Sequence, residues 1–316
     1  MNNHEVYKVF CEKEKELPLF LSYAWLNTVA PESWDVVIEE KGGEIIAAFP
    51  YVLQHRLGFK LMELPALTSY GGIWIKYPEG QKYTTRLSYE KEIFTALLDK
   101  LPRFDFFAQK FYPGFTNWLP FFWKGYKETT AYTYIIEDLS NTKAIFLDFK
   151  ENIRREIRKA GKTITITSSS DAIDILYDLY NYKGAATKMK LSITKDYMNT
   201  IFQFCVHNNC GELLVAKDEK GKTHAAALFV RDKKTTYYLF GVADPIFKNS
   251  GAMSLLIWEA IQRASTKSKQ FNFDGSMVEG IERFFRGFGA QQVPYFILKK
   301  YNSNILKIRA FLSELI

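Results

Sequence analysis

The spacing of apolar residues near the C-terminus predicts a helix between two short strands. Between residues 278 and 288, apolar side chains recur at helical spacing and charged side chains fall between them. The apolar members of this segment are Val278, Ile281, Phe284, Phe285 and Phe288. A short apolar run at 271–273 precedes this segment. Gly287 and Gly289 lie near the end of the segment, and a second apolar run follows at 293–298. Since glycine commonly ends helices, the pattern predicts a strand, a helix and a strand in succession.

The preceding part of the second half predicts three strands followed by a helix. Apolar runs at 212–216, 224–230 and 235–241 are separated by polar turns, as in a series of antiparallel strands. Residues 251–264 then carry a wide apolar face, which is typical of a helix packed on a sheet. Upstream, the same patterns predict a helix at 149–160, a strand at 163–167 and helices at 171–182 and 195–208.

The first half repeats this order of elements. Its patterns predict strands at 34–38, 44–49 and 72–75, a helix at 89–101, a strand at 104–108, a short helix at 118–123 and a strand at 131–136. Phe-Asp-Phe at 104–106 matches Phe-Asn-Phe at 271–273, and the segment 121–125 matches 284–287. Repetition at this period predicts two duplicated domains, and chance agreement between two ordinary α/β segments is the alternative. Only one opening helix, at 18–29, is predicted in this half, which suggests a degenerate copy.

The length of 316 residues suits two domains of about 150 residues each. A polar, loop-like stretch at 138–143 marks the boundary, so we predict one domain at 1–140 and a second at 141–316. Apolar residues make up 47% of the chain, which is enough for two cores, and the order of elements predicts the α/β (α+β) class.

Composition argues against several classes of protein. The three cysteines and four histidines have no metal-ligand spacing, so neither a metal site nor a disulfide framework is expected. The first residues lack the pattern of a signal peptide, and no apolar stretch reaches the roughly 20 residues of a membrane-spanning helix. A cytoplasmic location without a membrane span is therefore expected. The net charge of +7 suits an anionic ligand but does not by itself predict nucleic-acid binding.

Three stretches carry a resemblance to a known family. The main one is Phe-Asp-Gly-Ser-Met at 273–277 followed by Glu-Arg-Phe-Phe-Arg-Gly-Phe-Gly-Ala at 282–290, and the stretches 116–126 and 152–160 support it. With the order of elements, they resemble the Fem-type (FemAB-like) aminoacyl and peptidyl transferases of the GNAT superfamily and related acyl-CoA acyltransferases. The resemblance implies two tandem GNAT-like domains, each with a mixed, largely antiparallel sheet flanked by helices. It also implies transfer of an acyl or aminoacyl group to an amine on a small molecule or peptide.

The same resemblance implies one of two donors. Fem-type enzymes use aminoacyl-tRNA as donor and an amine on a peptidoglycan precursor as acceptor, and they often carry a long helical hairpin, whereas other relatives use acyl-CoA. No hairpin pattern lies between residues 168 and 211 and the basic excess is modest. We therefore favour a coenzyme A thioester and keep aminoacyl-tRNA as the alternative.

The expected donor site follows from the family's fold. The donor's phosphates face a helix N-terminus, where backbone N–H groups and the helix dipole attract anions. The matching residues are Lys248, Asn249, Ser250, Gly251 and Ala252, although Met253 departs from the family's pattern. Backbone N–H groups at Gly241 and Val242 are expected to bind the carbonyl oxygen of the acyl group.

Acylation of an amine also needs a base for the ammonium proton. We predict Asp274 as this base, because it ends a buried strand before a Gly-Ser break; the alternative is that Asp274 or Ser276 caps the following helix. Glu279 and Tyr295 are further candidates for catalysis. The candidate substrate-binding residues are aromatic or basic: Tyr112, Trp118, Arg155, Arg158, Lys188, Arg283 and Arg286.

Two interpretations from other classes stay open. The first is a degenerate GNAT-like binding module without catalysis. The second is an RNA-binding role for the basic helix that contains Arg154, Arg155 and Arg158, which can equally be a solvated face. Hydrolysis by a nucleophilic residue finds no support, because the chain has no Gly-x-Ser-x-Gly elbow and no cysteine with an identifiable histidine partner.

Overall fold

The computed structural model describes residues 3–168, 172–187, 193–275 and 277–314. Contacts along the chain divide it into two compact units. Unit 1 comprises Met1–Ala131 together with Pro294–Ile316, and unit 2 comprises Tyr132–Val293. None of the helices in the described ranges is long and apolar enough to cross a membrane.

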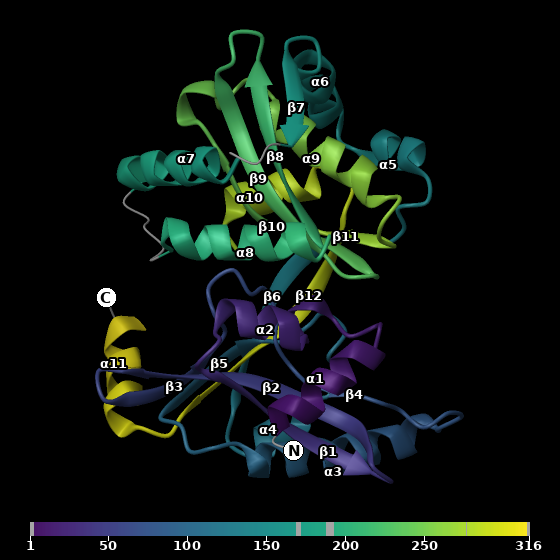
Figure 1. Ribbon diagram of the computed structural model, residues 1–316, viewed down its shortest axis with the longest axis vertical. Helices are drawn as coiled ribbons and strands as arrows, with labels where there is room; N and C mark the ends of the chain where they lie inside the picture. Colours follow the sequence, from purple (N-terminus) through teal and green to yellow (C-terminus); the bar gives the residue numbers. More distant parts are fainter. Residues whose placement is uncertain (1–2, 169–171, 188–192, 276, 315–316) are drawn as a thin grey trace. The chain divides into compact units, whose positions relative to one another are not determined.

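Unit 1 is a sheet with helices packed against it (Figure 1). The sheet has the order β1-β2-β3-β5-β12, in which β3 and β5 are parallel and the other neighbours antiparallel, and the short β4 pairs with β2. The strands are β1 (Trp34–Lys41), β2 (Glu44–Arg56), β3 (Phe59–Glu63), β4 (Trp74–Ile75), β5 (Phe106–Lys110) and β12 (Gln291–Tyr301). The helices are α1 (Asn3–Lys13), the 3₁₀ turn η1 (Leu19–Leu21), α2 (Tyr23–Val29), α3 (Tyr83–Lys100), α4 (Leu119–Trp123) and α11 (Asn304–Glu314).

Aromatic side chains fill the core of unit 1. Phe49 of β2, Phe107 of β5 and Phe121 of α4 are fully buried. The ring of Phe49 meets each of the other two edge to face, with ring centroids 6.3 Å apart in both pairs, which is a favourable arrangement for aromatic rings. Phe94 and Leu97 of α3 join the same cluster. This core packs α3 and α4 against the sheet.

Unit 2 is a second sheet flanked by helices. Its sheet has the order β6-β11-β10-β9-β8-β7, in which β10 and β11 are parallel and the other neighbours antiparallel. The strands are β6 (Lys127–Ile136), β7 (Ile164–Ser168), β8 (Gly211–Asp218), β9 (Thr223–Arg231), β10 (Thr235–Ala243) and β11 (Gln270–Asn272). The helices are α5 (Thr142–Asp148), α6 (Glu151–Ala160), α7 (Ala172–Thr187), α8 (Lys195–His207), the 3₁₀ turn η2 (Pro245–Phe247), α9 (Ala252–Ala264) and α10 (Glu279–Arg286).

Helices cover both faces of the unit 2 sheet. α7 and α8 lie on one face, and α6 and α9 lie on the other (Figure 1). Because successive side chains of a strand point to opposite faces, a strand covered on both sides is buried at every position. β9 is buried without interruption from His224 to Val230. Its Ala225, Ala227 and Phe229 belong to the same core cluster as the buried face of α9.

Two strands pair with partners from the opposite half of the sequence. β6 follows α4 in sequence but pairs with β11 in unit 2, through Phe271 opposite Ile136. β12 follows α10 in sequence but pairs with β5 in unit 1, through Ile297 opposite Lys110. This differs from the expected division into 1–140 and 141–316, because the contacts of β12 place residues 294–316 with the first half.

The predicted α/β class, with largely antiparallel sheets flanked by helices, is confirmed. The predicted helix at 18–29 is instead two elements, η1 and α2. Ser22 separates them because it has an extended backbone and its hydroxyl accepts a hydrogen bond of 3.2 Å from the N–H of Trp25, which caps α2. Of the loop-like stretch expected at 138–143, residues 138–141 lie outside helices and strands, and α5 begins at Thr142 after the side-chain cap Asn141.

Candidate functional site

A cavity opens in unit 2 where two parallel strands separate. β10 and β11 pair over three residues, from Thr235 opposite Gln270 to Tyr237 opposite Asn272. β10 then continues to Ala243, whereas the chain leaves β11 and turns. The space beyond the last pair has a volume of about 330 Å³ and is lined by Tyr238, Leu239, Phe240, Gly241, Ala243, Met253, Phe273, Asp274, Gly275, Ile281, Phe284 and Phe285. The lining is therefore apolar apart from one carboxylate, one phenol and backbone groups.

β10 is irregular beside this cavity. Tyr238 pairs with Phe229 and Phe240 pairs with Leu228, so Leu239 is an extra residue that forms a β-bulge. A Cβ at Gly241 would lie 2.1 Å from the hydroxyl oxygen of Tyr238. Glycine at this position therefore leaves room for the Tyr238 side chain. Burial raises the pKa of the Tyr238 phenol well above its usual value, so the hydroxyl stays protonated.

Asp274 and Gly275 form a tight turn at the edge of the cavity. Both have a left-handed backbone, with φ of 60° and 63°, a conformation that is uncommon for residues other than glycine. The side-chain oxygen of the buried Asn272 accepts hydrogen bonds from the N–H of Asp274 at 2.8 Å and from the hydroxyl of Thr133 at 2.6 Å. A Cβ at Gly275 would lie 2.3 Å from the carbonyl oxygen of Tyr132. These contacts with β6 fix the backbone that carries the Asp274 carboxylate.

The structure also bears on the alternative that Asp274 or Ser276 caps the following helix. α10 begins at Glu279 and its N-cap residue is Val278, which makes no side-chain capping hydrogen bond. Asp274 is therefore not the N-cap residue of α10, and Ser276 lies outside the described residues.

The N-terminus of α9 is the expected donor-phosphate site. Gly251 is its N-cap residue with φ of 75°, and a Cβ there would lie 2.9 Å from the backbone oxygen of Glu156 in α6. The hydroxyl of Ser250 accepts from the N–H of Ala252 at 3.2 Å, and the hydroxyl of Ser254 donates to Glu156 Oε2 at 2.7 Å. The N–H of Ala252 is therefore already bonded within the chain, and the Glu156 carboxylate already lies at this helix N-terminus, where an external anion would bind. Lys248 and Asn249 are exposed beside this helix start.

Sequence analysis missed a hydrogen-bonded cluster at the base of α10. The hydroxyl of Tyr134 in β6 donates to Glu282 Oε1 at 2.6 Å and accepts from the side-chain amide of Gln292 at 2.7 Å. The guanidinium of Arg286 donates to the same Glu282 oxygen at 2.7 Å. The hydrogen bond from Tyr134, followed by that from Arg286, lowers the pKa of the Glu282 carboxyl. Helical spacing predicts the Glu282–Arg286 pair, but no local pattern points to Tyr134, which is 148 residues away in sequence.

The structure places the other catalytic candidates apart from the cavity lining. Glu279 is exposed at the first position of α10 and is not among the lining residues. Tyr295 belongs to unit 1, where its ring meets that of Tyr70 edge to face with centroids 5.4 Å apart. Val242, predicted as a donor to the acyl carbonyl, has a buried side chain.

The predicted substrate-binding residues fall in several places. Tyr112 and Trp118 lie in unit 1, where the hydroxyl of Tyr112 accepts from the N–H of Phe20 at 3.2 Å. Arg155 and Arg158 are exposed on α6, and Arg283 is exposed on α10. Arg158 lies 3.9 Å from Glu151 and stands over the Phe146 ring at 5.7 Å. Arg286 is committed to Glu282, and Lys188 lies outside the described residues.

A buried polar group in unit 1 was also missed. Tyr70 lies next to Tyr112, with ring centroids 5.3 Å apart, as well as next to Tyr295. It thus joins two residues that sequence analysis selected separately. The preceding residue, Ser69, is also buried. On β5, the buried side-chain amide of Gln109 has no hydrogen-bond partner within the described part of the chain. Buried amides without a partner are uncommon in folded proteins.

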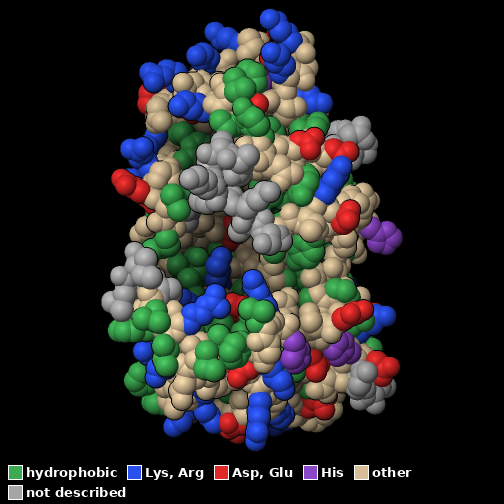
Figure 2. Space-filling view, turned by 90° about the vertical axis from the view of Figure 1, so that its left-hand side faces the viewer, with side chains coloured by type: hydrophobic (Ala, Val, Ile, Leu, Met, Phe, Trp, Pro, Cys, Tyr) green, Lys and Arg blue, Asp and Glu red, His purple; other side chains and the backbone are tan. Residues whose placement is uncertain are grey.

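Basic side chains gather at one end of unit 2. Figure 2 shows Lys and Arg, with carboxylates among them, at the end that carries α6 and the turn between β8 and β9. Within α6, Glu151 binds Arg154 at 2.6 Å and lies near Arg158, so acidic residues dilute the positive field. The exposed basic residues of these segments are Arg155, Arg158, Lys159, Lys162, Lys220 and Lys222.

Comparisons with known proteins agree with this geometry. Residues 148–275 match the family model described as an acetyltransferase (GNAT) domain. This segment runs from before α6 to the Asp274–Gly275 turn and so includes most of the cavity lining. A sequence comparison with curated proteins gives no match.

Three solved structures show the same fold over nearly the whole chain. FemX is 14% identical, with 93% of this chain and 95% of that chain covered and a TM-score of 0.67. L-PGS from Bacillus licheniformis is 13% identical, with 99% and 96% covered and a TM-score of 0.58. A tandem GNAT protein from the clavulanic acid biosynthesis pathway is 8% identical, with 95% and 94% covered and a TM-score of 0.53. The chain therefore contains a segment, residues 148–275, that matches a GNAT acetyltransferase domain, and over nearly its whole length it has the fold of FemX and of the tandem GNAT protein.

Proposed function

We propose that this chain is an N-acyltransferase that holds the acyl group of its donor in the cavity between β10 and β11 and transfers it to an amine. The observation that carries the proposal is the position of Asp274, which has the only carboxylate among the described residues that line a largely apolar cavity. An acyl chain suits apolar walls, and an ammonium acceptor needs one nearby base. The GNAT family match over residues 148–275 supports acyl transfer at this place.

The proposed reaction uses groups of unit 2. Asp274 takes a proton from the ammonium, the amine nitrogen then forms a bond to the acyl carbon, and the bond to the donor's sulfur or oxygen breaks. The nitrogen loses its second proton to solvent, and the leaving thiolate or alkoxide takes a proton from solvent. Beyond Tyr237, the edge of β10 that faced β11 has no strand partner within the described ranges. Backbone N–H groups on that edge, including those in the Gly241 and Val242 region, would donate to the oxyanion.

The favoured donor is a coenzyme A thioester. Its pyrophosphate would lie at the N-terminus of α9, where Gly251 lets the chain turn and the exposed Lys248 supplies a positive charge. Aminoacyl-tRNA is the second candidate, and one observation favours it. The Glu156 carboxylate, hydrogen-bonded to Ser254, places a negative charge at the same helix start and would repel a pyrophosphate. An aminoacyl ester has no pyrophosphate to place there.

A transfer assay with a generic acceptor tests the proposal without knowledge of the natural amine. Purified protein would be incubated with hydroxylamine and either acetyl-CoA or a mixture of aminoacyl-tRNAs, and hydroxamate formation measured. We expect hydroxamate above the uncatalysed rate from one donor, and the donor that reacts identifies the class. Failure of both donors, with a folded protein, would contradict the proposed activity and favour a binding module without catalysis.

A further inference from the structure

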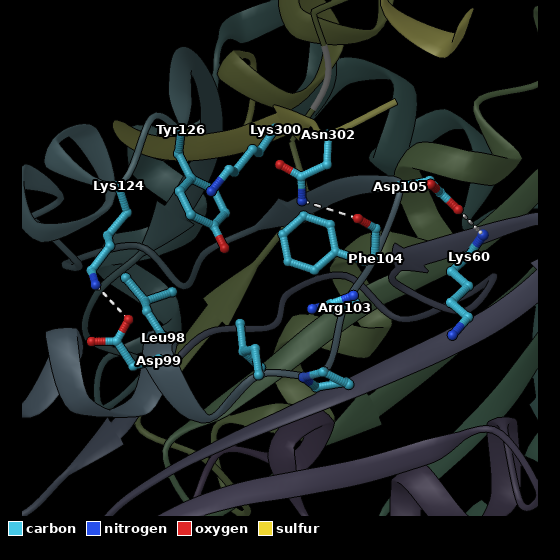
Figure 3. A pocket seen from close by; sticks show the side chains of 12 residues that line it. Lys60, Leu98, Asp99, Arg103, Phe104, Asp105, Lys124, Tyr126, Lys300 and Asn302 are labelled. Carbon is cyan, nitrogen blue, oxygen red and sulfur yellow. Dashed lines mark hydrogen bonds and ion pairs between the residues drawn. The ribbon is translucent and has the colours of Figure 1, made fainter. Parts of the chain in front are cut away.

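A second cavity lies wholly within unit 1, in a different place in the fold. It is open to solvent, has a volume of about 570 Å³ and is lined by residues from the end of α3, the segment before β5, the segment after α4 and the end of β12 (Figure 3). This volume is within the usual range for sites of small molecules. The parallel pair β3–β5 begins at Leu61 opposite Phe106, and the cavity lies before that start, at Lys60 and Asp105. The unit 2 cavity instead lies after the end of the parallel pair β10–β11.

The walls of this cavity carry an excess of positive charge. Four basic residues and two acidic residues line it: Lys60, Arg103, Lys124, Lys300, Asp99 and Asp105. Both carboxylates already have partners. Asp99 pairs with the ammonium of Lys124, and Asp105 Oδ2 accepts from the backbone N–H of Lys60 at 2.8 Å. In the described part of the chain, Lys60, Arg103 and Lys300 make no ion pair, so their three positive charges exceed the one negative charge of Asp105, which only a neutral backbone N–H contacts.

Lys300 is held in place by aromatic rings and not by a carboxylate. Its ammonium lies 5.0 Å from the centre of the Tyr126 ring and 6.0 Å from that of Phe104. Figure 3 shows the labelled side chains of the three residues at the cavity. Cation–π contacts of this kind orient an ammonium without neutralising it. Burial, with a smaller contribution from the charge of Lys124, lowers the pKa of Lys300. A bound anion would raise the pKa of Lys300 again and so oppose the effects of burial and of the Lys124 charge.

The wall around Lys300 is also rigid. The side-chain amide of Asn302 donates to the backbone oxygen of Phe104 at 3.0 Å, and the backbone oxygen of Asp105 accepts from the N–H groups of Asn302 and Ser303. These bonds tie the end of β12 to the start of β5. The cavity thus combines a fixed frame, uncommitted cations and the face of a half-exposed phenyl ring.

We propose that the unit 1 cavity binds a small phosphorylated molecule, with Lys300 and Arg103 contacting its phosphate and Phe104 its organic part. Lysine binds phosphate as a point charge, and arginine binds it through paired N–H groups. The two cations stand on separate segments, which suits a phosphate lying between them. The site belongs to unit 1 alone, so it stands whether or not unit 2 performs acyl transfer.

Isothermal titration of the full chain with pyrophosphate, and separately with uridine diphosphate, tests this proposal. We expect saturable binding of at least one probe. Tighter binding of uridine diphosphate would support a contact with Phe104, and equal binding would support recognition of the phosphates alone. Lys300→Met should weaken binding about tenfold or more, because it removes a charged partner of the phosphate and keeps the apolar stem. Arg103→Gln, at an exposed position, should weaken it in the same direction.

Lys299→Met is the matched control. Lys299 is exposed and precedes Lys300 on β12, so its side chain points to the opposite face of the sheet. The Lys299→Met substitution removes a positive charge as Lys300→Met does, but it should leave the affinity for the probes unchanged. The proposal would be overturned by the absence of saturable binding of both probes, by unchanged affinity in Lys300→Met and Arg103→Gln, or by an equal loss in Lys299→Met. If Lys300→Met failed to fold, Arg103→Gln alone would decide.

Discussion

Glu156 of α6 accepts a 2.7 Å hydrogen bond from Ser254, the third residue of α9. A carboxylate near a helix N-terminus is stabilising, because it faces free N–H groups and the positive end of the helix dipole. The same place is where a GNAT fold is expected to receive the phosphates of a donor. If the phosphates of a coenzyme A donor bind here as proposed, the Glu156 carboxylate would compete with them, and the balance between the two anions bears directly on the choice of donor.

Replacement of Glu156 by Gln tests this competition. The amide can keep a hydrogen bond to Ser254, but the negative charge is gone. We expect coenzyme A to bind about three- to tenfold more tightly to Glu156→Gln than to the wild type, with a loss in unfolding free energy of about 0.3–1 kcal/mol. Calorimetric titration and urea denaturation measure the two quantities. Unchanged coenzyme A affinity would mean that its pyrophosphate does not lie at the start of α9.

Gly275 should tolerate no side chain. Its φ of 63° disfavours alanine, and a Cβ would lie 2.3 Å from the carbonyl oxygen of Tyr132. We expect Gly275→Ala to lower the free energy of unfolding by about 1–3 kcal/mol. Gly280 in α10 is the matched control, because a Cβ there meets no atom within 4 Å, and alanine in a helix should stabilise by about 0.5–1 kcal/mol. Equal stabilities for the two variants in urea denaturation would show that the turn is not held as described.

The Glu282 cluster should make part of the stability depend on pH. Hydrogen bonds from Tyr134 and Arg286 lower the pKa of the Glu282 carboxyl in the folded chain. The unfolded chain therefore binds a proton at Glu282 more readily than the folded chain does. The contribution is therefore complete above the unfolded value of about 4.3 and is lost as pH falls through the lower, folded value. Glu282→Gln should show a smaller loss of stability between about pH 5 and pH 3 than the wild type. Denaturation midpoints across this range test the prediction, with Glu279→Gln as the control on the same helix. A pH dependence identical to that of the wild type would contradict it.

The local elements could be predicted well from periodicity. The helix expected from Val278 begins at Glu279, and the helix expected at 251–264 is α9 at Ala252–Ala264. In both, apolar side chains recur at helical spacing after a glycine, at Gly275 and Gly251. The short β3 was missed and the strand expected at 72–75 is reduced to Trp74–Ile75. These short strands take their form from pairing with β2 and β5, which no local pattern reveals.

Long-range pairing limited the rest of the prediction. β6 and β12 are both apolar strands that follow an aromatic helix, so their sequences do not show that each completes the other unit's sheet. For the same reason the sequence does not show that Tyr295 belongs to unit 1. Asp274 could be selected because it ends a strand before a glycine, whereas the hydrogen bond from Thr133 that positions Asn272 crosses 139 residues. Lys300 is one of several basic residues near the C-terminus, and only the fold places it over Tyr126.

The hydroxamate assay with an Asp274→Asn variant tests the central claim most directly. Asparagine keeps the shape of the side chain but cannot accept the ammonium proton, so acyl transfer should fall about 100- to 10,000-fold while the protein stays folded. Glu219→Gln, in the exposed turn between β8 and β9, removes a carboxylate elsewhere in unit 2 and should keep the wild-type rate. A loss confined to Asp274→Asn would support catalysis at the β10–β11 cavity. A rate for Asp274→Asn within about threefold of the wild type, which is under 1 kcal/mol in activation free energy, would contradict it.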